Sequence, residues 1–280
     1  MVKPKPQEEK YLKIRHSTVV KSNDLIQKSR FSLSLLQQRI LLYLISQITP
    51  VDDDFKLYEF SIAEFCKVCG ISYNGRSYNE IKAIIKEIAD KSVWITLEDN
   101  KTETLVRWIE KPYINADDGF IRIKLDADMK PYLLQLRENF TQFELIYTLK
   151  MKSKYSIRLY ELVKSIHFNE FKEYIRSYKV EDLKILLDAT GYNTFKDFHQ
   201  RALKPAVEEI NKYTDKNIKY EQIKDGRKTI AICFTIETKD IGDRIKIVSD
   251  IDKEFGTNQM TLWDRMGNDT TTTEAGDMNE

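Results

Sequence analysis

Apolar and polar positions in the first half of the chain recur in two periods. A spacing of three to four residues predicts amphipathic helices, and an alternating pattern predicts strands. Each of the first three expected helices follows a serine with Gln or Glu three positions on, the pattern of a capping box. These helices are expected at 35–48, 62–69 and 78–91, behind Ser34, Ser61 and Ser77. Gly70 should end the second in left-handed backbone. Strands at 93–97, 104–115 and 120–125 and a helix capped by Asp126 follow.

The second half repeats this order of elements. An amphipathic helix is expected at 153–168, a short one at 180–187, and a third at 195–213 behind Thr194. Two strands at 217–223 and 229–238 then form a hairpin around Asp225-Gly226. Helix, helix, helix, hairpin is the order of a winged helix-turn-helix. The sequence therefore predicts an α+β protein with two tandem winged helix-turn-helix domains.

The expected divisions of the chain follow from that repeat. Residues 1–20 are interpreted as a flexible leader, and 250–280, which are polar and acidic, as a disordered tail. The first domain is expected to span 21–138 and the second 139–249, joined near 139–150.

Composition adds a partner class and a compartment. The net charge of +1 combines −6 over residues 250–280, from eight acidic and two basic residues, with +7 over the remainder. A basic body favours a polyanionic partner. Three cysteines give no disulfide framework, and neither a signal region nor a membrane-length apolar run is evident. We therefore expect a cytoplasmic protein with no membrane partner.

The helix at 195–213 carries the strongest candidate site. At 100° per residue, its core side holds Phe195, Phe198, Ala202, Leu203, Ala206, Ile210 and Tyr213. The opposite side presents Asp197, Gln200, Arg201, Lys204 and Glu208. In a DNA major groove, an arginine pairs with guanine and a glutamine with adenine. Base contacts are thus assigned to Asp197, Gln200, Arg201 and Lys204, with Lys196 on phosphate. The alternative is a solvated helix face. Pro205 is expected to kink the helix.

Further basic residues are expected to contact the DNA backbone. They are Lys224, Arg227 and Lys228 at the hairpin tip, and Lys152, Lys154 and Arg158 at the start of the helix at 153–168. In the first domain, the third helix exposes Arg76, Asn79 and Lys86. The alternatives are an ordinary polar turn for the hairpin tip and a solvated linker for the helix start. For the third helix of the first domain, base-specific contact is weighed against phosphate-only contact or no contact.

Enzymatic sites fail on composition and spacing. The segment from Gly70 to Ser77 lacks the lysine of a phosphate-binding loop and follows a helix instead of a strand. Cys66 and Cys69 lack a second ligand pair for zinc, and the three histidines are widely separated. We expect no catalytic residue, no metal and no cofactor.

The tail contains one apolar peptide, Gln259-Met260-Thr261-Leu262-Trp263, within acidic sequence. It resembles the short peptide by which bacterial proteins bind the replicative sliding clamp. In that resemblance Gln259 forms hydrogen bonds, and Leu262 and Trp263 fill an apolar pocket. The alternative is a tail that folds back on the body.

Three stretches carry a wider resemblance. They are SLSLLQQRILLYLISQI at 32–48, LKMKSKYSIRLYELVKS at 149–165, and FKDFHQRALKPAVEEINKYTDKNIKYEQIKDGRKTIAICFTI at 195–236. The chain, over about residues 17–238, resembles plasmid replication initiators of the Rep-3 family, which bind repeated origin DNA called iterons.

That resemblance implies sequence-specific contact by Gln200, Arg201 and Lys204 with double-stranded origin DNA, and no enzymatic activity. It implies origin opening, recruitment of the host initiator, helicase and sliding clamp, and a monomer in equilibrium with a homodimer that represses its own gene. A winged-helix transcriptional regulator without a replication role is the alternative, but a repressor has no evident need for the tail peptide.

Overall fold

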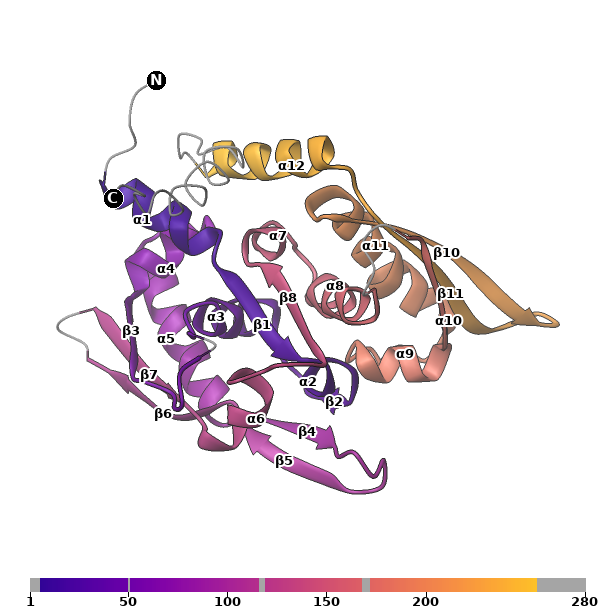
Figure 1. Cartoon of the computed structure of the whole chain (residues 1–280), viewed down its shortest axis with the longest axis horizontal. Helices are drawn as coiled ribbons and strands as arrows, with labels where there is room; N and C mark the ends of the chain where they lie inside the picture. Colours follow the sequence, from indigo (N-terminus) through magenta and orange to yellow (C-terminus); the bar gives the residue numbers. More distant parts are fainter. Residues whose placement is uncertain (1–5, 50, 116–118, 168–171, 256–280) are drawn as a thin grey trace, which may run out of the picture.

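The computed structural model describes residues 6–49, 51–115, 119–167 and 172–255 (Figure 1). The part of the chain that contains the first winged domain, residues 18–149, is built from helices and three small antiparallel sheets. Its helices are α2 (Asn23–Gln27), α3 (Leu35–Ile45), α4 (Ile62–Cys69), α5 (Gly75–Ala89), the 3-10 turn η1 (Ala127–Met129), α6 (Lys130–Leu133) and α7 (Ile146–Leu149). Its strands are β1 (Thr18–Ser22), β2 (Ser29–Arg30), β3 (Tyr58–Ser61), β4 (Ser92–Thr96), β5 (Glu103–Arg107), β6 (Ile109–Ile114), β7 (Phe120–Leu125) and β8 (Phe140–Glu144). The sheets pair in the orders β2-β4-β5, β3-β7-β6 and β1-β8.

Local capping explains where the first helices begin. Ser34 accepts from the Gln37 backbone N–H while the Gln37 side chain accepts from the Ser34 N–H, so the capping box is confirmed. Gly70 ends α4 at φ 64°, also as predicted. The start expected for α5 at Ser77 is wrong, because Asn74 caps the helix. Ser77 is the third residue of the helix, and its side chain completes the capping box with Asn74.

The second winged domain has one strand more than expected. Its elements are β9 (Tyr174–Lys179), α9 (Val180–Leu186), α10 (Phe195–Phe198), a π-helical turn (His199–Leu203), α11 (Lys204–Tyr213), β10 (Lys216–Asp225) and β11 (Lys228–Thr238). The sheet order is β10-β11-β9, so the unforeseen strand β9 lies at one edge. The β10–β11 hairpin projects from the body as the wing (Figure 1).

Helix α8 (Lys154–Ile166), capped by Ser153, lies between the two halves. It packs on α2, α3 and β8 on one side and on α11 on the other. The segment expected to join the domains near 139–150 is not a free connection. Phe140–Glu144 pairs with β1, and α7 is buried throughout.

The flexible leader predicted for residues 1–20 is wrong from Pro6 onward. Residues Pro6–Arg15 form α1, which lies on α4, and β1 follows as a strand of the core. The guanidinium of Arg15 is fully buried and donates to the carbonyls of Lys67 (2.8 Å) and Val68 (3.0 Å) in the last turn of α4. These carbonyls lack helical partners, so the arginine both caps α4 and fixes α1.

The disordered tail predicted from residue 250 starts too early. Ile241–Glu254 form α12, which leaves the second domain and packs on α11 and α7 (Figure 1). Its end meets the N-terminal region. His16 lies between Asp252 (Nε2 to Oδ2, 2.8 Å) and Glu144 (Nδ1 to Oε2, 3.0 Å), and Phe255 packs on Arg15. Residues 256–280, with the peptide of Gln259, Leu262 and Trp263, lie outside the described residues.

Among the helices that the structure describes, none combines the length and the apolar character needed to cross a bilayer.

Candidate nucleic-acid interface

The exposed face of the α10–π–α11 helix carries the residues assigned to base contact. Thr194 caps its start, accepting from the Asp197 N–H (3.0 Å) and donating its hydroxyl to the Asp197 carboxylate (2.7 Å). Phe198, Ala202, Leu203, Ala206 and Ile210 are buried at 0%, which fixes the helix against the core. Gln200, Arg201 and Lys204 are exposed on the other side. The inner and outer sides assigned from the sequence therefore agree with the burial of these residues, whereas Phe195 and Tyr213 are only half-buried.

The irregularity expected near Pro205 takes the form of a π-helical turn. The Lys204 N–H donates to the carbonyl of His199, five residues back, and Pro205 has no N–H to donate. A π turn inserts one residue into the helical repeat. Gln200 and Arg201 lie within this turn, so their direction is set by it.

Two weak ion pairs run along the exposed face. The Nε of Arg201 lies 3.9 Å from the Asp197 carboxylate, and the Nζ of Lys204 lies 3.8 Å from that of Glu208. The side chains of Arg201 and Lys204 are 70% and 58% exposed. Exposed pairs of this length contribute little free energy, about 0–1 kcal/mol, so both cations can exchange their partners for a polyanion.

The wing supplies a second basic surface. Asp225 pairs with Lys228, so the turn residues are Gly226 and Arg227, one position later than predicted. Gly226 adopts φ 56°, the conformation that favours glycine. Lys224, Arg227 and Lys228 are all exposed around the tip.

An aromatic contact joins the wing to the α10–π–α11 helix. The Nε2 of His199 is 2.8 Å from the hydroxyl of Tyr220 on β10, with ring centroids 5.8 Å apart. Burial raises the pKa of Tyr220, as does the charge of Glu208, so the phenol keeps its proton. This contact places His199 on the side of the helix that faces the wing.

The remaining basic residues differ in their accessibility. Lys152 is exposed, and Lys154 forms an ion pair of 2.5 Å with Asp188. Arg158 is 5% exposed and donates to Glu161 and to two backbone carbonyls. The prediction that Arg158 contacts DNA phosphate is therefore wrong, because its position on α8 faces the interior. In the first domain, Arg76, Asn79 and Lys86 are exposed on α5.

The two cysteines of α4 are buried, and burial raises the pKa of Cys69 to about 12. Within the described parts of the chain, no group of three or more His, Cys, Asp or Glu side chains could hold a metal ion.

Strand β9, which was not predicted, adds the exposed side chains of Arg176 and Lys179 to the sheet of the wing. The alternation of Tyr174, Arg176 and Tyr178 toward one face was the available signal, since these residues register with Ile236, Phe234 and Ile232 of β11.

Comparison with known proteins assigns both halves. Residues 18–164 match the family model described as initiator replication protein, WH1, and residues 179–236 match initiator Rep protein, WH2. The chain belongs to this family of replication initiators. The resemblance to Rep-3 initiators and the two winged-helix domains are thus confirmed. The WH1 match extends into α8, whereas α8 was expected to belong to the second domain. The boundary at 138 stays a prediction.

Two curated relatives come from Escherichia coli. A replication initiation protein is 24% identical over 225 residues, covering 78% of this chain and 69% of its own length. The PI protein is 26% identical over 206 residues, covering 68% of this chain and 65% of its own length. Among solved structures, the Pi initiator protein in complex with iteron DNA matches with a TM-score of 0.67 at 21% identity, covering 81% of this chain and 99% of that chain. This last similarity establishes the fold.

Proposed function

We propose that this protein initiates plasmid replication by binding repeated origin DNA in a sequence-specific manner. The observation that carries the proposal is the exposed polar face of the α10–π–α11 helix beside a basic wing. A helix of this kind enters the major groove with its N-terminal half, where Gln200 and Arg201 lie. The solved relative bound to iteron DNA supports the same ligand class.

In this proposal the contacts divide into two kinds. Gln200, Arg201 and Lys204 approach base edges, and Asp197 orients Arg201 through their ion pair. Lys196, Lys224, Arg227, Lys228 and Lys152 contact phosphates, which fixes the register without specifying sequence. Lys154 contacts phosphate only if its ion pair with Asp188 breaks. Arg76, Asn79 and Lys86 offer a second contact on the first domain.

The consequences of binding form the finer part of the proposal. Monomers on the repeats promote opening of the adjacent origin and recruit the host initiator and helicase, while dimers repress the protein's own gene. The tail peptide of Gln259, Leu262 and Trp263 would bind the sliding clamp and link opening to polymerase loading. These steps rest on family membership and on the tail sequence.

The test is a footprint of the purified protein on the DNA flanking its own gene at physiological salt. Protection of several direct repeats spaced by about two helical turns, roughly 21 base pairs, would support an initiator. Protection of a single inverted repeat over the promoter would instead favour a dimeric transcriptional regulator.

A further inference from the structure

The buried arginine of α8 contacts both winged domains at once. The guanidinium of Arg158 donates from one terminal nitrogen to the carbonyl of Ile26 in α2 (3.3 Å), and from Nε to the carbonyl of Leu186 in α9 (3.2 Å). Its other terminal nitrogen lies 3.2 Å from the Glu161 carboxylate. The guanidinium of Arg158 thus donates to acceptors on three helices, α2, α8 and α9.

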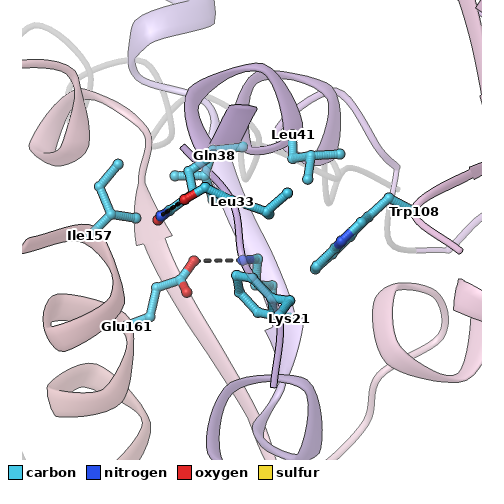
Figure 2. Close-up of a pocket in the computed structure, with 9 residues that line it drawn as sticks. Lys21, Leu33, Gln38, Leu41, Trp108, Ile157 and Glu161 are labelled. Atoms are coloured by element: carbon cyan, nitrogen blue, oxygen red, sulfur yellow. Dashed lines mark hydrogen bonds and ion pairs between the residues drawn. The ribbon is translucent and has the colours of Figure 1, made fainter. Parts of the chain in front are cut away.

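Two residues of the first domain contact this guanidinium or its partner Glu161. The ring of Phe31 lies 4.3 Å from its central carbon, a cation–π contact. Glu161 also accepts from the ammonium of Lys21 on β1 at 2.5 Å, and Figure 2 shows this pair beside Gln38 and Trp108. A cavity of only about 10 Å³ remains next to the pair, so the surroundings are closely packed.

The end of α9 is tied to the same region by a second contact. Asp188 follows α9 in left-handed backbone at φ 55°. Its carboxylate accepts from Ser32 of the first domain (2.9 Å) and pairs with Lys154 of α8 (2.5 Å). We call the set Ser32, Lys154, Arg158, Leu186 and Asp188 the interdomain junction.

Stability alone does not explain a buried charge group. Lys21, Arg158 and Glu161 are between 1% and 5% exposed, and removing such groups from water is costly. Apolar residues of similar volume often replace buried ion pairs without loss of stability. Unlike an apolar side chain, a guanidinium fixes the directions of its partners, because its N–H groups donate hydrogen bonds only within one plane. The junction therefore specifies one arrangement of α9 relative to α2.

We propose that Arg158 is a positioning residue that fixes the second winged domain relative to the first, and thereby sets which spacing of two DNA half-sites the protein accepts. Helix α9 is the first helix of the helix-turn-helix, and the second helix carries Gln200, Arg201 and Lys204. A rotation of α9 about the junction would move these residues away from the α5 surface of the first domain. The DNA part of this inference rests on the proposed function.

The first experiment measures domain geometry without DNA. Spin labels are placed at Leu105→Cys on β5 and Ile175→Cys on β9, which are 50% and 60% exposed, in a Cys233→Ser background. Cys66 and Cys69 are buried and remain. We expect one narrow distance distribution in the parent and a distribution at least twice as broad in Arg158→Met. Arg158→Lys should also broaden it, because a single ammonium cannot hold both carbonyls. Lys253→Met, an exposed site on α12, serves as control.

A milder variant guards against misfolding. Asp188→Asn leaves the buried groups intact and removes only the charge opposite Lys154, so partial broadening is expected. Narrow distributions in all three junction variants would overturn the proposal.

The second experiment measures spacing on DNA. Binding is compared for the native repeat and for a repeat with one base pair inserted between the regions protected by the two domains. The parent should lose about tenfold affinity on the inserted repeat, and Arg158→Met less than threefold. An equal loss in parent and variant would overturn the role in spacing. If the parent binds no repeat at all, the proposed function fails, while the distance measurement still decides whether Arg158 positions the domains.

Discussion

At the scale of single residues, the test of sequence-specific binding is Arg201. Its side chain is 70% exposed, and only a long ion pair to Asp197 restrains it in the free protein. We expect Arg201→Ala to weaken binding to the cognate repeat by about 1–3 kcal/mol and to relax base preference at one position. Arg201→Lys should recover the charge but not the bidentate contact. Titrations on cognate and random duplexes measure this, and equal losses on both would contradict a base contact.

Lys228 tests the phosphate contacts of the wing. It lies at the start of β11 beside the turn at Gly226, exposed and remote from the hydrophobic core. Lys228→Ala should weaken binding to all duplexes alike and reduce the slope of log affinity against log salt by about one. Lys253→Ala on α12 is the matched control for loss of a surface charge. A salt slope that stays the same would show that Lys228 makes no phosphate contact.

At the scale of elements, the C-terminal end of α4 joins the two ends of the described chain. Gly70 has φ 64°, and a Cβ there would overlap ring carbons of Phe255. Gly226 has a similar φ of 56° with nothing near its Cβ position. We expect Gly226→Ala to cost only the backbone strain, about 1–2 kcal/mol of unfolding free energy, and Gly70→Ala to cost more.

Urea denaturation of both variants checks this difference. Adding Phe255→Ala should relieve part of the Gly70→Ala cost, because neighbouring sites are not additive. Additive losses in the double variant would mean that Phe255 does not dock on Gly70 in solution.

The same elements explain how far the sequence could predict this structure. Ser34, Gly70 and Thr194 act on residues within four positions, so their caps were evident from local pattern. Helices α1 and α12 were missed because what fixes them is distant: Arg15 caps α4 some 50 residues on, and His16 meets Asp252. Arg158 was misassigned for the same reason. The local sequence of a basic residue near a helix start indicates exposure to solvent. The carbonyls of Ile26 and Leu186, which bind Arg158 in the interior, are distant in the sequence.

At the scale of the whole molecule, the tail and the body should act separately. In the sequence, the tail peptide follows the last residue of α12 and both regions matched by the family models. We expect replacement of Leu262 and Trp263 by alanine to abolish binding of the purified sliding clamp and to leave affinity for the repeats within about twofold. Pull-down and DNA titration of the same preparation measure both. Clamp binding that survives the double replacement would contradict the motif assignment.

The stability of the whole molecule should fall in acid through a buried carboxylate at the end of α11. Asp215 is 4% exposed and accepts from Tyr160 (2.8 Å) and from Lys164 (3.0 Å), both on α8. Burial alone would raise the pKa of Asp215, but the charges of Lys164 and Lys216 outweigh it and hold the pKa below its ordinary value. A carboxylate with a lowered folded-state pKa stabilises the fold above its unfolded pKa of about 4, and this contribution is lost as the pH falls toward the folded value.

Asp215→Asn should therefore cost roughly 2 kcal/mol at pH 7, the range of a hydrogen bond to a charged group. The difference from the parent should shrink as the pH falls below about 4, because the parent then loses the same charge. Urea denaturation at pH 7, 5, 4 and 3 measures it, with Glu221→Gln as the exposed control on β10. A difference that stays constant over this pH range would mean that shape, and not the charge of Asp215, links α8 to the second domain.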